Sequence, residues 1–176
     1  MLPQPSGTLA LTRRVLRALR VLNLVYGFAL LALLVATLVA PDQVFNALGI
    51  SPAKLTSTIS RGARFIMLVG LAAVPAVHLV LIRLLAMVQT VVAGDPFIDD
   101  NSRRLTVIAW SVLYLELLRI AVAAIAARVS AEDGARGLDV GWSFSFAPWL
   151  AVLLLFVLAR VFEHGARMRT DLEGTV

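Results

Sequence analysis

The sequence has 176 residues, of which 60% are hydrophobic and 15% are charged, whereas about a quarter of the residues of a soluble domain are charged. This balance excludes an ordinary soluble domain and predicts a single transmembrane domain over residues 1–176. The net charge is +5 and cysteine is absent, which excludes disulfides and sulfur ligands. Because the arginines lie at the ends of apolar runs, we expect them to contact lipid headgroups, and we expect no direct nucleic-acid binding.

The first long apolar run covers residues 21–40, which carry no charge and follow four arginines. At about 1.5 Å per residue, this run crosses the hydrocarbon core of a bilayer. Pro41 and Asp42 are expected to end its helix. The arginines also resemble those of an export signal, but the length of the run and the proline after Ala40 favour a retained span.

The second run covers residues 65–82 and is bracketed by Arg64 and Arg83. Gly70 and nearby alanines would allow another helix to approach closely. Apolar residues continue beyond Arg83 at helical spacing until Gly94, which predicts that the same helix leaves the membrane here.

The third and fourth runs cover residues 105–127 and 143–159. The third follows a cluster of helix-capping side chains at 99–102, and the fourth has a proline that is acceptable in a first helical turn. The predicted fold is therefore all-α, an integral membrane four-helix bundle with short amphipathic extensions.

Orientation follows from the positive-inside rule. If the four runs cross the membrane in turn, ten basic residues lie on the side of both termini and five on the other side. We therefore expect both termini, the loop 83–104 and the tail 160–176 to be cytoplasmic.

Glu116 and Arg119 are charged residues near the middle of the third run. Three residues apart, they share one helical face and can pair, and an isolated charge at that depth would be costly. One hypothesis is a structural ion pair, and the other is a polar site for a ligand, a signal or an ion. His78, in the second run, is a candidate third member because imidazole titrates near neutral pH.

The sequence lacks three common motifs of catalytic and nucleotide-binding sites: it has no G-x-S-x-G elbow, no H-E-x-x-H helix and no phosphate-binding glycine loop. We therefore predict no catalytic residue, no cofactor and no metal site. Asp95, Asp99 and Asp100 would suit a cation, but helix capping explains them more simply.

Two groups of residues carry a family resemblance. They are Gly94-Asp95-Pro96-Phe97, Asn101, Arg104-Leu105 and Trp110 in the second loop and third run, and Ala159-Arg160-Val161-Phe162, Gly165 and Asp171–Val176 at the end. With this order and spacing, the chain resembles a bacterial four-helix membrane family known as domain of unknown function 2975. The resemblance implies a bacterial inner-membrane protein without an assigned activity, and a small helix-turn-helix DNA-binding regulator as candidate partner.

The loop and the tail are the expected cytoplasmic interaction surface. Its candidate residues are Pro96, Phe97, Asn101, Arg104, Phe162, Asp171 and Glu173. The alternative is that these residues only pack together at the inner interface. The expected function is non-enzymatic sensing or relaying of a signal to a cytosolic partner; the alternative is a small transporter or channel component that uses Glu116 and Arg119. Besides lipid, a second copy of the chain is a candidate partner.

Overall fold

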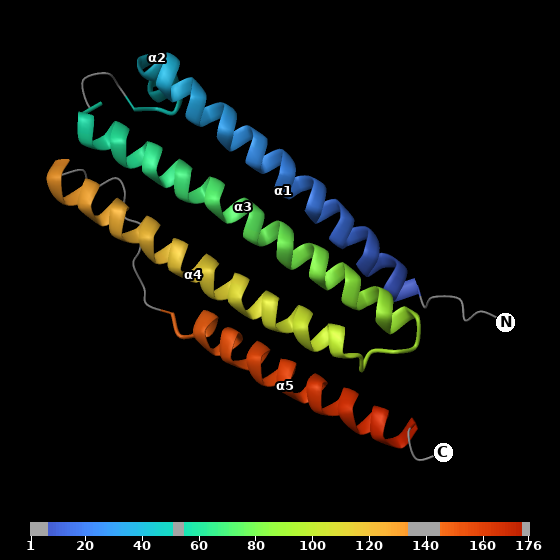
Figure 1. Ribbon diagram of the computed structural model, residues 1–176. Coiled ribbons are helices and arrows are strands. Elements are labelled where there is room, and N and C mark those ends of the chain that lie inside the picture. The colour runs from blue at the N-terminus through green and yellow to red at the C-terminus, as the bar shows by residue number, and fades with distance from the viewer. Residues whose placement is uncertain (1–6, 51–54, 134–144, 174–176) are drawn as a thin grey trace. The chain divides into compact units, whose positions relative to one another are not determined.

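A computed structural model describes residues 7–50, 55–133 and 145–173, with no account of the side chains of 7–8, 132–133 and 170–173. All regular secondary structure within these ranges is helical (Figure 1). The elements are α1 (Gly7–Val39), α2 (Pro41–Ala47), α3 (Ser57–Val92), α4 (Asp99–Asp133) and α5 (Ala147–Glu173). Among the described residues, α1, α3, α4 and α5 are long and apolar enough to cross a membrane. The predicted all-α fold with four membrane-length helices is confirmed.

The helices are longer than the apolar runs that predict them. α1 begins at Gly7, well before the run at 21–40, and α3 continues to Val92, as expected from its apolar spacing. The reason is that hydropathy marks only the part of a helix that suits hydrocarbon, while arginine and leucine in the flanks remain good helix formers. α5 begins at Ala147, and residues 143–144 of the predicted fourth span lie outside the description.

The short helix α2 was not predicted from the sequence. α1 ends as expected before Pro41, because Ala40 has a non-helical φ of −139°. Pro41 then begins a new helix, a position where its missing N–H costs nothing. Gly49, with φ +84°, ends it: the N–H of Gly49 donates to Asn46 and that of Ile50 donates to Phe45, the Schellman arrangement.

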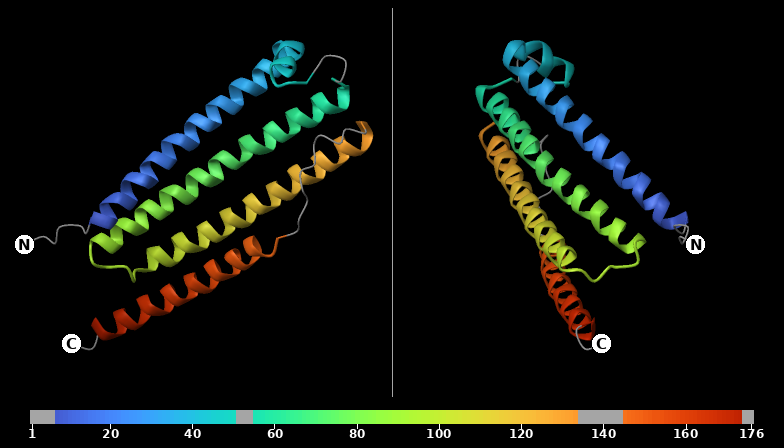
Figure 2. Two further views of the ribbon diagram at one scale, coloured as in Figure 1. Left: turned by 180° about the vertical axis from the view of Figure 1, so that it is seen from behind. Right: turned by 45° about the vertical axis from the view of Figure 1, so that its right-hand side comes forward.

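The chain divides into two compact units. The first unit comprises Met1–Asn23, Ala76–Tyr114 and Ser145–Val176, and the second comprises Leu24–Pro75 and Leu115–Phe144. In the first unit, the start of α1, the loop between α3 and α4 and the end of α5 lie at the same end (Figures 1 and 2). The predicted cytoplasmic loop and tail are therefore neighbours in space.

Glycines allow close helix packing in the second unit. A Cβ on Gly70 of α3 would lie 2.9 Å from Leu30 of α1, and one on Gly62 would lie 2.4 Å from Val129 of α4. Both distances are shorter than real Cβ contacts, so with a Cβ at either position the facing side chain would have to move. Gly70 thus lies where α3 contacts a side chain of α1.

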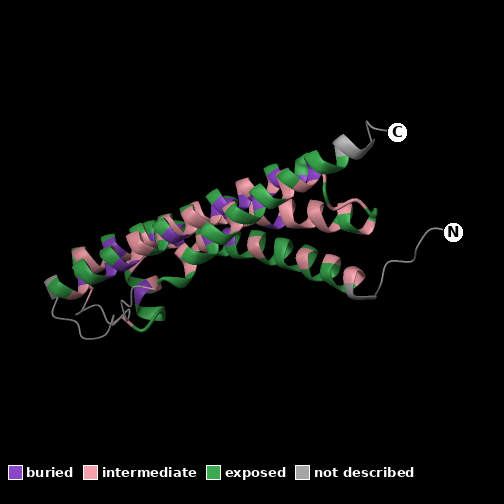
Figure 3. Cartoon of the chain, turned by 90° about the horizontal axis from the view of Figure 1, so that it is seen from below, coloured by how far each residue is buried: buried purple, intermediate pink, exposed green. Residues whose placement is uncertain are grey.

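Large apolar side chains are exposed mainly on α1 and α5. Phe28 of α1 is 72% exposed and Leu150 of α5 is 65% exposed, and exposed residues occur along the length of the helices (Figure 3). Apolar surface of this extent is a liability in water. It is the surface that a helix presents to lipid.

Candidate functional sites: a loop-and-tail surface and an intramembrane ion pair

The loop between α3 and α4 begins at Gly94, which has the left-handed backbone conformation that glycine adopts without strain. Gly94 has φ +84°, which lets its N–H donate to Val91 while the N–H of Asp95 donates to Thr90. These two bonds satisfy carbonyls at the end of α3, and Pro96 then prevents the helix from continuing. The sequence Gly94-Asp95-Pro96 therefore sets where the chain turns.

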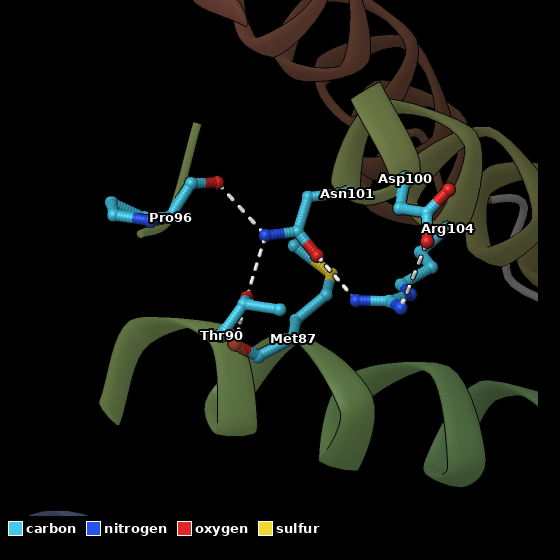
Figure 4. A network of polar contacts seen from close by, with 6 residues as sticks. All are labelled: Met87, Thr90, Pro96, Asp100, Asn101 and Arg104. Atoms are coloured by element: carbon cyan, nitrogen blue, oxygen red, sulfur yellow. Dashed lines mark hydrogen bonds and ion pairs between the residues drawn. The ribbon is translucent and has the colours of Figure 1, made fainter. Parts of the chain in front are cut away.

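Asn101, in the first turn of α4, connects this loop to both neighbouring helices (Figure 4). Its Nδ2 donates to Thr90 Oγ1 of α3 at 2.7 Å and to the carbonyl oxygen of Pro96 at 2.8 Å, and its Oδ1 accepts from Arg104 Nη1 at 2.8 Å. The side chain is 0% exposed. One buried amide thus holds the end of α3, the loop and the start of α4 together.

The orientation of this amide follows from its partners. Thr90 Oγ1 donates its proton to the carbonyl of Met87 at 2.7 Å, so toward Asn101 it accepts. Arg104 has only donors, so it requires the amide oxygen, and its other terminal nitrogen lies 3.4 Å from Asp100. Only one placement of the nitrogen and oxygen of Asn101 satisfies all these groups. We call these residues (Met87, Thr90, Pro96, Asp100, Asn101 and Arg104) the Asn101 network.

The tail packs on the loop. The rings of Phe97 and Phe162 lie 5.3 Å apart between centroids, and a Cβ on Gly165 would lie 3.0 Å from the Phe97 ring. Arg169 forms an ion pair with Asp95. We define these five residues as the loop-and-tail surface. It joins two segments that are far apart in the sequence.

The predicted interaction residues therefore fall into two groups. Phe97 remains 46% exposed despite its contact with Phe162, so it is available to another molecule. Asn101 is fully buried and the Arg104 side chain is 18% exposed, and both make hydrogen bonds within the Asn101 network. The side chains of Asp171 and Glu173 lie outside the description.

The intramembrane ion pair lies on α4 in the second unit. Arg119 Nε donates to Glu116 Oε2 at 2.9 Å, and Arg119 Nη2 donates to Glu116 Oε1 at 2.7 Å. Both carboxylate oxygens thus face one guanidinium, a bidentate geometry that is among the stronger protein hydrogen-bond arrangements. The Glu116 side chain is 5% exposed and that of Arg119 is 46% exposed. The structure brings the two predicted residues together.

His78 belongs to the first unit, whereas Glu116 and Arg119 belong to the second. Its Nδ1 is buried and has no hydrogen-bond partner among the described residues. The oxygens of Glu116 are already occupied by Arg119, so the geometry gives no support to His78 as a third member of the pair.

Sequence reasoning missed a polar contact between α1 and α3. Arg64 Nη2 donates to the backbone carbonyl of Thr37 at 2.6 Å, while Thr37 Oγ1 donates to Leu34. A cation near the last carbonyls of a helix is favourable. Arg64 was recognisable as the boundary of an apolar run, but a partner 27 residues away carries no signal in one sequence.

No group of three or more histidines, aspartates or glutamates arranged to hold a metal occurs in the described ranges. The two sites offer aromatic packing, ion pairing and hydrogen bonding at the loop-and-tail surface, and charge pairing at Glu116 and Arg119.

Comparison with known proteins gives one match. The sequence model of a family described as "protein of unknown function (DUF2975)" matches residues 9–176. No curated protein and no solved structure matches the chain.

Proposed function

The chain belongs to the family of unknown function DUF2975, and on that premise we propose that it is a non-enzymatic membrane protein that relays a signal to a soluble partner. The partner would bind the loop-and-tail surface. The observation that carries this proposal is the way the loop is held: a buried hydrogen-bond network below it and the tail beside it. A surface fixed in advance loses little entropy on binding.

The chemistry of the surface suits a protein partner. Phe97 offers an exposed aromatic ring, and aromatic residues are enriched among those that contribute most to protein interfaces. The ion pair of Asp95 and Arg169 lies on the same surface, and charges around an aromatic anchor select among partners. A small helix-turn-helix regulator, which the family resemblance implies, is the partner that we propose.

The proposed orientation places this surface in the cytoplasm. The first unit contains ten of the 16 basic residues, including the arginines before the first apolar run. Excess arginine beside membrane-crossing helices is typical of the cytoplasmic side. The loop and the tail both belong to this unit, so the same orientation would place both in the cytoplasm.

Affinity purification of the full-length protein in mild detergent tests the proposal. We expect a soluble DNA-binding protein to co-purify with the native chain and to be lost from Phe97→Ala. Phe65→Ala is the matched control, because Phe65 is also an exposed phenylalanine but lies on α3 in the second unit. It should retain the partner.

Two results would contradict the proposal. One is that no soluble protein co-purifies with the native chain above the level of an unrelated membrane protein. The other is that Phe65→Ala and Phe97→Ala lose the partner equally, although both variants elute as monodisperse particles. In either case Phe97 and Phe162 would only pack together.

A transporter or channel component is the second candidate, since a carboxylate such as Glu116, buried within a membrane-length helix, is a functional hypothesis by default. The bidentate contact with Arg119 weighs against it by occupying both oxygens. Proton flux into liposomes that contain the native chain, absent with folded Glu116→Gln, would favour this candidate over signal relay.

A further inference from the structure

A groove lies between α4 and α5 in the first unit, separate from the loop-and-tail surface. Its volume is about 810 Å³. Its walls combine basic, acidic and apolar side chains, among them Asp99 and Arg103 from α4 and Phe156, Arg160 and Glu163 from α5.

The groove and the loop-and-tail surface use different faces of α5. Arg160, Glu163 and Arg167 line the groove at a spacing of three and four residues, which places them on one helical face. Phe162 and Gly165 contact the loop. Phe162 lies two positions after Arg160, and Gly165 lies two positions after Glu163. At about 100° per residue, two positions turn the helix through roughly half a circle. Occupation of the groove therefore does not require the loop contacts to change.

The groove carries an excess of positive charge. Glu163 is shared by two guanidinium groups, with 3.0 Å to Arg160 Nη1 and 2.6 Å to Arg167 Nη2. Arg103 on the opposite wall is exposed and forms no ion pair among the described residues. With Asp99 included, three arginines face two carboxylates. The charge complement of this groove is an anion.

The position of the groove along the helices indicates what kind of anion. The third apolar run begins at Leu105, just after Arg103, and the fourth ends at Ala159, just before Arg160. Both basic walls thus lie where an apolar run ends, while Phe156 and Val157 extend the groove toward the apolar part of α5. A bilayer has its phosphates at such a boundary and its acyl chains beside the apolar part.

We propose that this groove binds the headgroup of an anionic phospholipid. The phosphate lies between Arg103 and Arg160, because guanidinium groups match phosphate oxygens in a bidentate geometry. One acyl chain follows Phe156 and Val157. A soluble anion would gain the charge contacts but not the apolar wall, which distinguishes a lipid from a free phosphate.

Native mass spectrometry of the full-length chain in detergent, with equimolar phosphatidylglycerol and phosphatidylcholine, tests the proposal. The native chain should retain phosphatidylglycerol preferentially. Since one basic residue near an anionic surface contributes a factor of about five in binding, Arg103→Gln should reduce the preference about five-fold, and Arg103→Gln with Arg160→Gln should remove most of it.

Arg128→Gln is the matched control, because Arg128 is an exposed arginine of the same helix that lies in the second unit. It should keep the native preference. Inorganic phosphate at millimolar concentration should not displace the lipid. Circular dichroism and a monodisperse elution profile show that each variant is folded.

Three outcomes would overturn the proposal: equal retention of the two lipids by the native chain, an unchanged preference in the folded double variant, or displacement of phosphatidylglycerol by inorganic phosphate. The first would mean that the groove does not select an anionic headgroup, and the last would make it a site for a free anion. None depends on the soluble partner, so this proposal and the proposed function can fail separately.

Discussion

The two polar assemblies of this protein differ in what they connect. Glu116 and Arg119 pair within one turn of α4, so their hydrogen bonds neutralise charge without joining one helix to another. The Asn101 network joins the end of α3, a loop and the start of α4 through one buried amide. The first assembly allows charged residues to lie in an apolar segment. The second holds the loop between the two helices that it connects.

The largest stability effect should come from breaking the ion pair. Glu116→Gln leaves the Arg119 guanidinium without its carboxylate in the apolar part of α4, where an unpaired charge is costly. Arg119→Leu leaves the carboxylate alone and should be similarly harmful. Unfolding by sodium dodecyl sulfate in mixed micelles measures both losses.

The double variant Glu116→Gln with Arg119→Leu sharpens this test. If charge neutralisation is the role of the pair, removing both partners should restore much of the stability that either single variant loses. Additive losses in the double variant would mean that the two residues act independently, contrary to the bidentate geometry.

The second effect concerns the Asn101 network. Asn101→Ala removes the partner of Thr90, Pro96 and Arg104 at a fully buried position. Leaving a buried polar group unsatisfied costs about 1–3 kcal/mol, so we expect a loss of that order in the same unfolding assay. We also expect faster amide hydrogen exchange in the loop 93–98.

Asn101→Asp serves as the control for that variant. It keeps an acceptor for Arg104 but loses the two N–H donors to Thr90 and Pro96. Loop exchange as slow as in the native protein would show that the contacts of Asn101 with α3 and the loop do not hold the loop.

The two left-handed glycines offer a smaller, matched comparison. Gly94 and Gly49 both have φ +84°, and a Cβ on either would meet nothing within 4 Å. Each change to alanine therefore adds only backbone strain, about 1 kcal/mol. Both should lower stability equally, but only Gly94→Ala should weaken retention of the soluble partner. If the two variants retained the soluble partner equally, the shape of the loop at Gly94 would not matter for partner binding, contrary to the proposal.

The smallest effect is expected at the ion pair of the loop-and-tail surface. The side chains of Asp95 and Arg169 are 38% and 47% exposed, and exposed pairs contribute about 0–1 kcal/mol. Arg169→Gln should leave the unfolding midpoint almost unchanged and should alter mainly the salt dependence of partner retention. A large loss of stability would mean that the tail is a structural element of the first unit.

The sequence predicts local features better than distant ones, and the reason is physical. The spacing of Glu116 and Arg119 alone places them on one helical face, and Gly94-Asp95-Pro96 alone marks a helix end. The contact of Phe97 with Phe162 and the bond from Arg64 to Thr37 join residues far apart in the chain. Neither can be derived without the fold.

Helix boundaries and burial show the same limit. Hydropathy located the four membrane-length helices but not their ends, and α2 was missed because seven residues at Pro41–Ala47 are too few to show a period. Asn101 was predicted as a residue of the cytoplasmic interaction surface, with packing at the inner interface as the alternative, and it is fully buried. Its burial depends on three partners, only one of which is a neighbouring side chain on α4.

Cysteine labelling tests the central claim, that the loop and the tail form one surface on the cytoplasmic side of a membrane-spanning chain. The chain has no cysteine, so single cysteines at exposed Asn46, Phe97 and Met168 can be probed with a membrane-impermeant maleimide in intact cells and after lysis. Position 46 should react in intact cells, and positions 97 and 168 only after lysis. Labelling of positions 46 and 168 from the same side, or of 97 and 168 from opposite sides, would contradict the account.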